Sequence, residues 1–313
     1  QFEKNRKFSN EDARDGARQI LWGFFKKMVI ADNAATMVNR IFENYDYMPT
    51  FYLWLGAVFF AFQIYGDFSG YSDIAIGTAR LFGFNLTKNF NFPYFSKDFS
   101  EFWRRWHISL STWLRDYLFL PISYSVMNRT QKARIWGIKI EIIAYTIGII
   151  FTWFLGGLWH GAKWTFIIWG SVHGLYLVFA HITKRIRKRT LKLLHIRKNN
   201  KLLIFFQTIL VFIFTVLAWV FFRADDANHA FKYLSLMFNP DVFHIPMLPG
   251  KYKLNIIILV FFVFTEWLQR RKDHVLKIDK IPIIYRWSIY IFILYLIVFT
   301  GNFNKVEFIY FQF

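Results

Sequence analysis

The sequence predicts an all-α, polytopic membrane protein, and three observations support this fold class. Apolar runs recur along the 313 residues, and a helix needs ~20 apolar residues to cross a bilayer. Aromatic residues make up 22% of the chain, a share that would leave large apolar patches on a soluble domain. The lysines and arginines behind the net charge of +19 cluster between the apolar runs, as the positive-inside rule requires.

Composition and motifs also exclude several classes of function. Basic and aromatic residues do not alternate along a shared surface, which argues against a nucleic-acid partner. The chain has no cysteine, so disulfides, thiolate catalysis and cysteine–zinc sites are excluded. No phosphate-binding loop and no G-x-S-x-G elbow occurs. Neither His107 nor His160 has a histidine or carboxylate three or four residues away, so we expect no metal site.

The first sixteen residues are polar and contain neither Met nor a signal-peptide pattern. We therefore expect earlier spans of a longer chain to precede them. Ser9 or Asn10 is the expected cap of a first helix. Residues 20–42 are apolar but carry Lys26, Lys27 and Asp32, which favours a partly interfacial or short tilted helix.

Six later runs read as spans, and they share a mostly apolar composition: 51–64, 140–158, 164–180, 202–222, 254–268 and 287–300. Three basic segments separate them, at 128–139, 184–201 and 269–280, and we place all three in the cytoplasm. Segment 184–201 has no acidic residue, but an ordinary cytoplasmic loop is favoured over a site for nucleic acid or anionic lipid. Segment 223–252 is expected to be an external loop that contains a short amphipathic helix. The C-terminus is also expected on the external side of the membrane. With no repeat, residues 1–313 form one membrane domain.

The polar stretch at 65–84 contains Asp67, Tyr71 and Asp73. The cost of burying carboxylates favours a solvated loop. The apolar flanks and recurring glycines favour a broken helix that lines a cavity, which is the reading we prefer.

Residues 85–100 form an expected loop, and a helix is predicted over 102–122, where His107, Ser111 and Leu114 share one side. Its arginines, Arg104, Arg105 and Arg115, need phosphate, carboxylate or water. On periodicity alone, two alternatives are together equally favoured: an amphipathic interfacial helix with its arginines at lipid headgroups, and a structural histidine with satisfied hydrogen bonds.

Residues 159–174, WHGAKWTFIIWGSVHG, place His160 and His173 in sequence apolar enough for a membrane interior. An imidazole is costly there, and an intramembrane ionisable group indicates a functional site by default. Gly156, Gly157 and Gly161 let the backbone break near His160. The nearby tryptophans, Trp159, Trp164 and Trp169, are suited to excluding water. This set favours general-base catalysis of group transfer inside the bilayer.

Three motifs, IYGDFSGYSDIAIG, EFWRRWHISLSTWLRDYLFLPI and GGLWHGAKWTFIIWGSVHG, closely resemble the membrane-bound O-acyltransferase (MBOAT) family. Within it they are most similar to the bacterial alginate O-acetyltransferase (AlgI) branch, to which the teichoic-acid D-alanyl transfer protein DltB is related. The opening DARDGARQILWGFFKKMVIADN and the ending FIYFQF share the resemblance.

The resemblance implies a ring of tilted and re-entrant helices around a central tunnel in the bacterial inner membrane. It identifies His160 as the catalytic histidine and His107 as the second important one, with His173 lining the channel. Acetyl-CoA is implied as a cytoplasmic acyl donor, with no bound cofactor, and the three arginines are candidates for its phosphates. Asp67, Tyr71, Asp73, Trp159 and Trp169 are the remaining supporting candidates.

The implied function is movement of acetyl across the membrane to a periplasmic partner of the SGNH type, which acetylates an exopolysaccharide such as alginate. Peptidoglycan or another cell-wall polymer is the alternative acceptor. A proton-coupled transporter is a rival from another class, disfavoured because no inverted repeat is detectable. A scaffold for a polymer synthase is a further rival, and it predicts that His160→Ala is silent.

Overall fold

The computed structural model is mostly helical and describes residues 9–130, 132–240, 246–303 and 308. The chain divides into two compact units. Unit 1 comprises Gln1–Phe92 and Ser235–Phe313, and unit 2 comprises Pro93–Leu234.

Six helices are long and apolar enough to cross a membrane, and each predicted span falls inside one of them. They are α3 Thr50–Leu81, α7 Ile140–His160, α8 Trp164–Ile182, α10 Lys201–Arg223, α12 Gly250–Gln269 and α13 Ile283–Thr300. The prediction of a multi-pass helical membrane protein is confirmed at this level.

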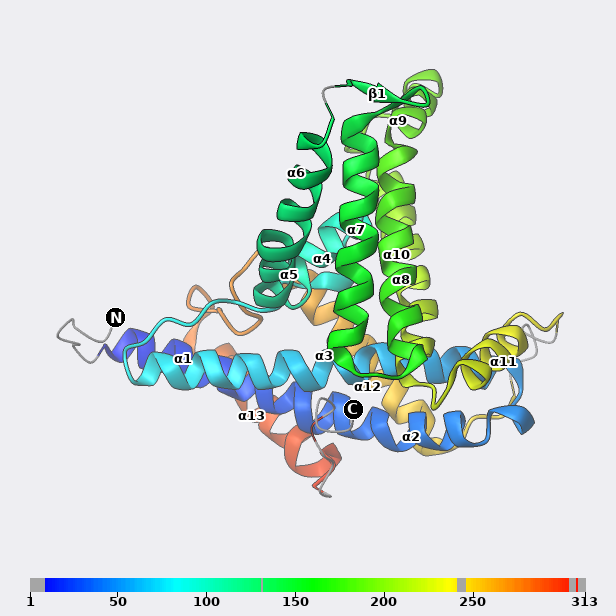
Figure 1. Ribbon diagram of the computed structural model, residues 1–313. Helices are drawn as coiled ribbons and strands as arrows, with labels where there is room; N and C mark the ends of the chain where they lie inside the picture. Colours follow the sequence, from blue (N-terminus) through cyan, green and yellow to red (C-terminus); the bar gives the residue numbers. More distant parts are fainter. Residues whose placement is uncertain (1–8, 131, 241–245, 304–307, 309–313) are drawn as a thin grey trace. The chain divides into compact units, whose positions relative to one another are not determined.

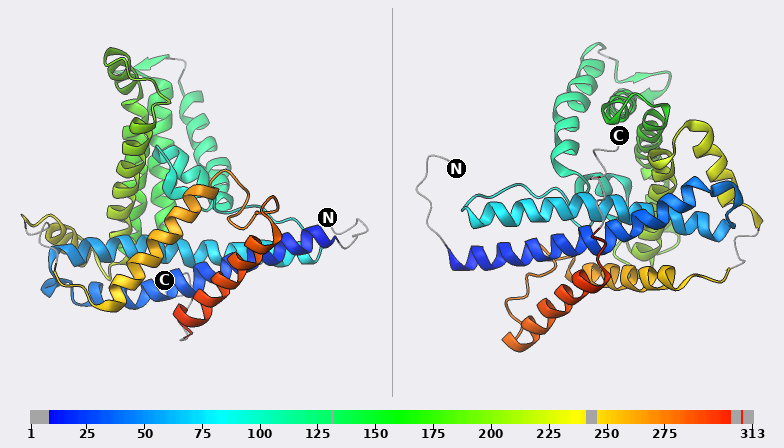
Figure 2. Two further views of the ribbon diagram at one scale, coloured as in Figure 1. Left: turned by 180° about the vertical axis from the view of Figure 1, so that it is seen from behind. Right: turned by 90° about the horizontal axis from the view of Figure 1, so that it is seen from below.

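Unit 1 begins with a continuous helical rod that runs beside α3 (Figure 2). The predicted cap is present, because the Ser9 side chain accepts a hydrogen bond from the Asp12 backbone N–H at 3.2 Å. The rod consists of α1 Asn10–Phe24, the π-helical η1 Phe25–Ala31 and α2 Asp32–Glu43, with the short η2 Tyr45–Tyr47 after it.

A solvated loop and a helix break are both wrong for the stretch at 65–84, because α3 continues unbroken to Leu81. The stretch does line a cavity, as predicted, through Tyr65, Ser69 and Asp73. The carboxylates remain in the helix because the rod supplies their counter-charges. Lys26 Nζ lies 2.6 Å from Asp73 Oδ2, and Lys27 Nζ lies 2.6 Å from Asp67 Oδ1. Lys27 also pairs with Asp32 at 2.8 Å. A buried charge is tolerated when it is paired and hydrogen-bonded, so neither a loop nor a break is needed.

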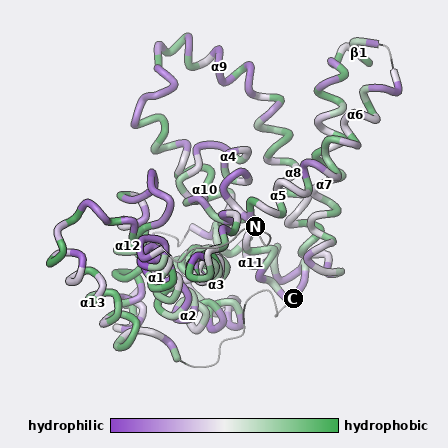
Figure 3. The backbone as a smooth tube through the Cα atoms, turned by 90° about the vertical axis from the view of Figure 1, so that its left-hand side faces the viewer, coloured by the Kyte–Doolittle hydropathy of each residue, from purple (hydrophilic) through white to green (hydrophobic). Residues whose placement is uncertain are grey.

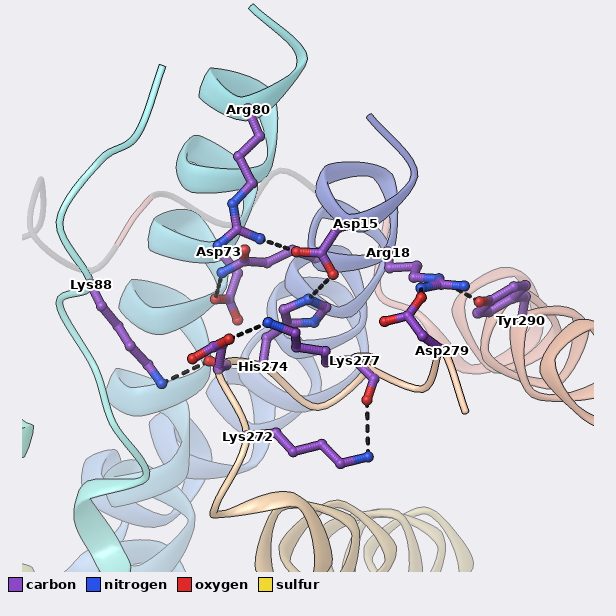
Figure 4. A network of polar contacts seen from close by, with 12 residues as sticks. Asp15, Arg18, Asp73, Arg80, Lys88, Lys272, His274, Lys277, Asp279 and Tyr290 are labelled. Atoms are coloured by element: carbon purple, nitrogen blue, oxygen red, sulfur yellow. Dashed lines mark hydrogen bonds and ion pairs between the residues drawn. The ribbon is translucent and has the colours of Figure 1, made fainter. Parts of the chain in front are cut away.

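The basic segment 269–280 is irregular, as predicted, but it packs into unit 1 (Figure 4). His274, Val275, Leu276 and Ile278 are all buried. Polar contacts fasten the segment to α1 and to the loop after α3: His274 Nε2 to Asp15 Oδ1 at 2.8 Å, Lys88 Nζ to the Asp273 carbonyl at 2.7 Å, and an Arg18–Asp279 ion pair. Arg18 also donates to Tyr290 on α13 at 2.6 Å.

Unit 2 contains the spans α7, α8 and α10. The antiparallel α7 and α8 lie side by side (Figure 1). They approach at glycines, because a Cβ on Gly170 would lie 2.3 Å from the Trp153 carbonyl oxygen and one on Gly157 would lie 2.4 Å from that of Phe166. The short elements of unit 2 are η3 Pro93–Phe95, α4 Phe99–Arg105, α5 Ile108–Leu114, η4 Arg115–Phe119, α6 Leu120–Asn128, β1 Arg134–Ile135, β2 Ile138–Lys139 and α9 Lys184–Leu193.

Three connecting segments differ from simple loops. Segment 128–139 contains a small antiparallel hairpin that turns at Trp136 and Gly137, both with positive φ. Segment 184–201, predicted as a loop, contains the helix α9. Segment 223–252 contains the predicted amphipathic helix, α11 Ala227–Met237. The aromatic C-terminal ending lies almost entirely outside the described residues.

Candidate functional site

His160 is the last residue of α7, and the predicted break follows it directly. Gly161 has φ +152°, a conformation that glycine adopts easily and L-residues rarely do. The imidazole is therefore presented at the end of an apolar helix. Aromatic rings surround it edge-on, with centroid distances of 4.9 Å to Trp159, 5.0 Å to Trp169 and 5.1 Å to Phe222.

His107 lies at a break between α4 and α5, so the single helix predicted over 102–122 is wrong. Its φ of 42° and ψ of 57° are left-handed, a conformation uncommon outside glycine that tends to occur at functional sites. Ser109 Oγ lies 3.4 Å from His107 Nδ1. His107 is also close enough to His160 for a charge on one imidazole to act on the other. The structure thus places His107 and His160 in the same unit, within range of a mutual electrostatic effect.

Burial lowers the pKa of His107 from 6.5 to about 4. The unfolded chain therefore binds more protons than the folded chain between these two values, and stability must fall as pH drops from 6.5 towards 4. We expect the thermal midpoint of the purified protein to fall over this range, and to fall less in His107→Gln. If the thermal midpoints of the wild-type and His107→Gln proteins fall equally with pH, the loss of stability would not come from protonation of His107.

His173 is completely buried on α8. Among the described residues neither of its ring nitrogens has a hydrogen-bond partner. Its neighbours are aromatic rings, with centroids 4.9 to 6.3 Å away: Phe102, Trp103, Trp153, Trp169, Tyr176 and Trp219. Trp169 contacts both histidines, at 5.0 Å from His160 and 5.1 Å from His173.

The predicted arginines have partners close to them in sequence. Arg104 donates to Ser100 at 2.6 Å, Arg105 pairs with Glu101 at 2.7 Å, and Arg115 pairs with Asp116 at 2.7 Å. These contacts do not gather the three side chains around one point, and their role towards donor phosphates stays a prediction.

The supporting candidates on α3 belong to unit 1. Asp67 and Asp73 are buried or nearly so in their ion pairs with Lys27 and Lys26, whereas Tyr71 is exposed. These contacts hold the two carboxylates in ion pairs within unit 1, and a role towards substrate stays a prediction.

A small cavity of about 20 Å³ lies in unit 1, which is room for about one water molecule. Lys26, Asp73 and Glu266 are among its lining residues, and Tyr65 Oη lies 3.0 Å from both Glu266 oxygens. Sequence reasoning missed Glu266, although a lone carboxylate within a predicted span was a usable signal.

The described residues contain no group of three potential metal ligands. The histidines of unit 2 instead form an aromatic-walled site with one imidazole at a helix end. Such a site can accept a proton from a hydroxyl. Of the three tryptophans predicted to exclude water, only Trp169 is buried, whereas Trp159 is 57% exposed and Trp164 is 70% exposed.

Comparison with known proteins gives a coherent set of relatives. The pattern of the membrane-bound O-acyltransferase family matches residues 6–223. A probable alginate O-acetylase AlgI of Azotobacter vinelandii is 40% identical over 225 residues, which is 72% of this chain and 40% of the relative. A peptidoglycan O-acetyltransferase of Helicobacter pylori is 38% identical over 219 residues, 69% of this chain and 37% of the relative.

A teichoic acid D-alanyltransferase of Bacillus subtilis is more distant, at 32% identity over 183 residues, covering 56% of this chain and 42% of the relative. The chain thus spans about two fifths of the length of the curated relatives it matches. The matched region includes the segments that carry His107, His160 and His173.

Proposed function

Because this chain belongs to the membrane-bound O-acyltransferase family, we propose that it carries the catalytic histidines of a bacterial inner-membrane O-acetyltransferase. The donor is the thioester acetyl-CoA, and the product is an O-acetyl ester that serves modification of an extracellular polysaccharide. The observation that carries the proposal is the position of His160, at the glycine-terminated end of an apolar span and within an aromatic enclosure.

The proposed chemistry needs only a base and a dry site. The neutral His160 imidazole takes the proton of the attacking hydroxyl, whose oxygen forms the new ester bond to the acetyl carbon. The thioester C–S bond breaks, and the proton passes to the leaving sulfur. General-base catalysis of this kind contributes typically ~10²–10⁴-fold. In the same proposal, His107 orients or polarises the donor carbonyl.

The acceptor is proposed from the relatives. An exopolysaccharide such as alginate comes first, and peptidoglycan is the second candidate because the two named relatives have similar identities, 40% and 38%. Transfer to either polymer is proposed to pass through a periplasmic partner of the SGNH type. We also propose that the complete protein forms a ring of helices around a central tunnel, in which donor and acceptor meet.

The test is transfer of radiolabelled acetyl from acetyl-CoA in membrane vesicles that carry the full-length gene product and its presumed partner. Label is expected on the partner or the polymer, and purified alginate and peptidoglycan acceptors distinguish the two candidates. Vesicles lacking the chain provide the background. Acetyl-CoA-dependent label no higher than this background would overturn the acetyltransferase proposal and favour the transporter or another donor.

His173→Phe tests whether the enclosed histidine serves the reaction. A buried imidazole without partners costs stability, so the apolar ring should leave unfolding free energy unchanged or raise it by about 1–3 kcal/mol. Transfer should nevertheless fall about 10-fold or more, because Trp169 links this ring to His160 and small displacements near the reacting atoms are costly.

The matched control is His181→Phe on the same helix, where the ring stacks on Tyr145 at 4.0 Å and no loss of transfer is expected. A stable His173→Phe protein with wild-type transfer would assign His173 to packing alone.

A further inference from the structure

The helix α9 has an unusual composition for a connecting segment. Six of its ten residues are basic, and none is acidic: Lys184, Arg185, Arg187, Lys188, Arg189 and Lys192. No residue of α9 is buried. In Figure 3 the segment shows hydrophilic residues interrupted by hydrophobic ones.

Two of the three Ile and Leu side chains of α9, Ile186 and Leu193, fall on one face, whereas Leu191 lies on the side of the lysines. At 3.6 residues per turn, Ile186, Thr190 and Leu193 lie one above the other. Lys184, Lys188 and Lys192 repeat every four residues on the opposite side. Ile186 is 64% exposed and Leu193 is 77% exposed, so the described chain leaves this apolar face uncovered.

The position of α9 between two spans indicates that lipid covers its exposed apolar face. The span α8 ends at Ile182, α9 begins at Lys184, and the span α10 begins at Lys201. Arg187 Nη2 donates to the Ala180 carbonyl at 2.5 Å, and Thr183 Oγ1 donates to the Phe179 carbonyl at 2.6 Å. Both bonds tie the start of α9 to the end of a span, which is where a bilayer has its headgroups.

We propose that α9 is an interfacial helix that binds anionic phospholipid headgroups, with Ile186 and Leu193 inserted among the acyl chains. A basic face beside an exposed apolar face is the pattern of helices that lie in the plane of a membrane surface. The basic side chains meet lipid phosphates of opposite charge, and this attraction weakens as salt screens it.

The absence of cysteine allows a direct test with single spin labels. The full chain would carry Leu193→Cys or Lys188→Cys and be placed in nanodiscs of phosphatidylcholine alone or with a third of phosphatidylglycerol. With phosphatidylglycerol, the label at 193 should become severalfold less accessible to a water-soluble relaxation agent, whereas the label at 188 should stay accessible. High salt should reduce the difference in accessibility of the label at 193 between the two lipid compositions.

Two variants with equal loss of charge sharpen the test. Combined Lys184→Gln, Lys188→Gln and Lys192→Gln substitutions should abolish the lipid dependence at 193. Combined Lys132→Gln, Arg134→Gln and Lys139→Gln substitutions, on the exposed hairpin of unit 2, should preserve it.

A label at 193 that stays water-accessible in both discs would overturn the proposal and leave an acidic protein as the partner to seek. If the label at 193 is equally inaccessible to water in both kinds of nanodisc, the proposed preference for anionic headgroups would be overturned.

Discussion

Replacing His160 with alanine should lower the rate of acetyl transfer by about 10²–10⁴-fold, the usual contribution of a general base. The substitution removes the only proposed proton acceptor at the end of α7. It should leave the fold intact, because the side chain is partly exposed and the helix end is set by Gly161. Labelled acetyl transfer in vesicles with matched protein amounts measures the effect.

His195→Ala is the control for this prediction, since His195 is an exposed histidine that follows α9. It should transfer acetyl at the wild-type rate. Normal polymer acetylation in an inserted His160→Ala protein would refute the catalytic assignment and support the scaffold.

Lys26→Met should destabilise the protein by about 3–5 kcal/mol, the usual cost of removing one partner from a buried ion pair. Lys26 is 4% exposed, and its loss leaves the Asp73 carboxylate without its counter-charge. Gln19 Nε2 still donates to Asp73 Oδ1 at 2.7 Å, but a neutral amide replaces little of the lost attraction. The free energy of unfolding in a defined detergent is the measurement.

Two variants test whether burial causes this effect. Lys26→Met combined with Asp73→Leu should recover much of the loss, because no unpaired charge remains. Lys277→Met breaks the exposed pair with Asp273 and should cost about 1 kcal/mol or less. Similar losses for Lys26→Met and Lys277→Met would show that the pair in unit 1 is not effectively buried.

Hydrophobic length predicted the spans well, since all six appear as helices of sufficient length. The end of α7 after His160 was also predictable, because glycine beside an apolar helix marks a break. These features are local, so the sequence alone encodes them.

The errors occur where distant residues meet. Residues 65–81 remain helical because Lys26 and Lys27 pair with Asp73 and Asp67, and no periodicity within α3 reveals those partners. The break at His107 depends on a left-handed residue that is not glycine, so the composition of 102–122 concealed it. The cage around His173 likewise gathers rings from α4, α7, α8 and α10.

In unit 1, residues early in the sequence contact residues late in the sequence. Unit 1 therefore cannot be completed until the late residues have been synthesised. Arg18 and its partner Asp279 are 261 positions apart, so at about 5–20 residues per second the ribosome needs roughly 10–50 s to supply the second after the first. During that interval Asp15 and Arg18 lack the partners from residues 274–290 that hold them in the finished protein. Unit 2 is continuous in sequence and can close earlier. A nascent chain that stops before residue 274 would therefore contain every residue of unit 2 but would lack residues that complete unit 1.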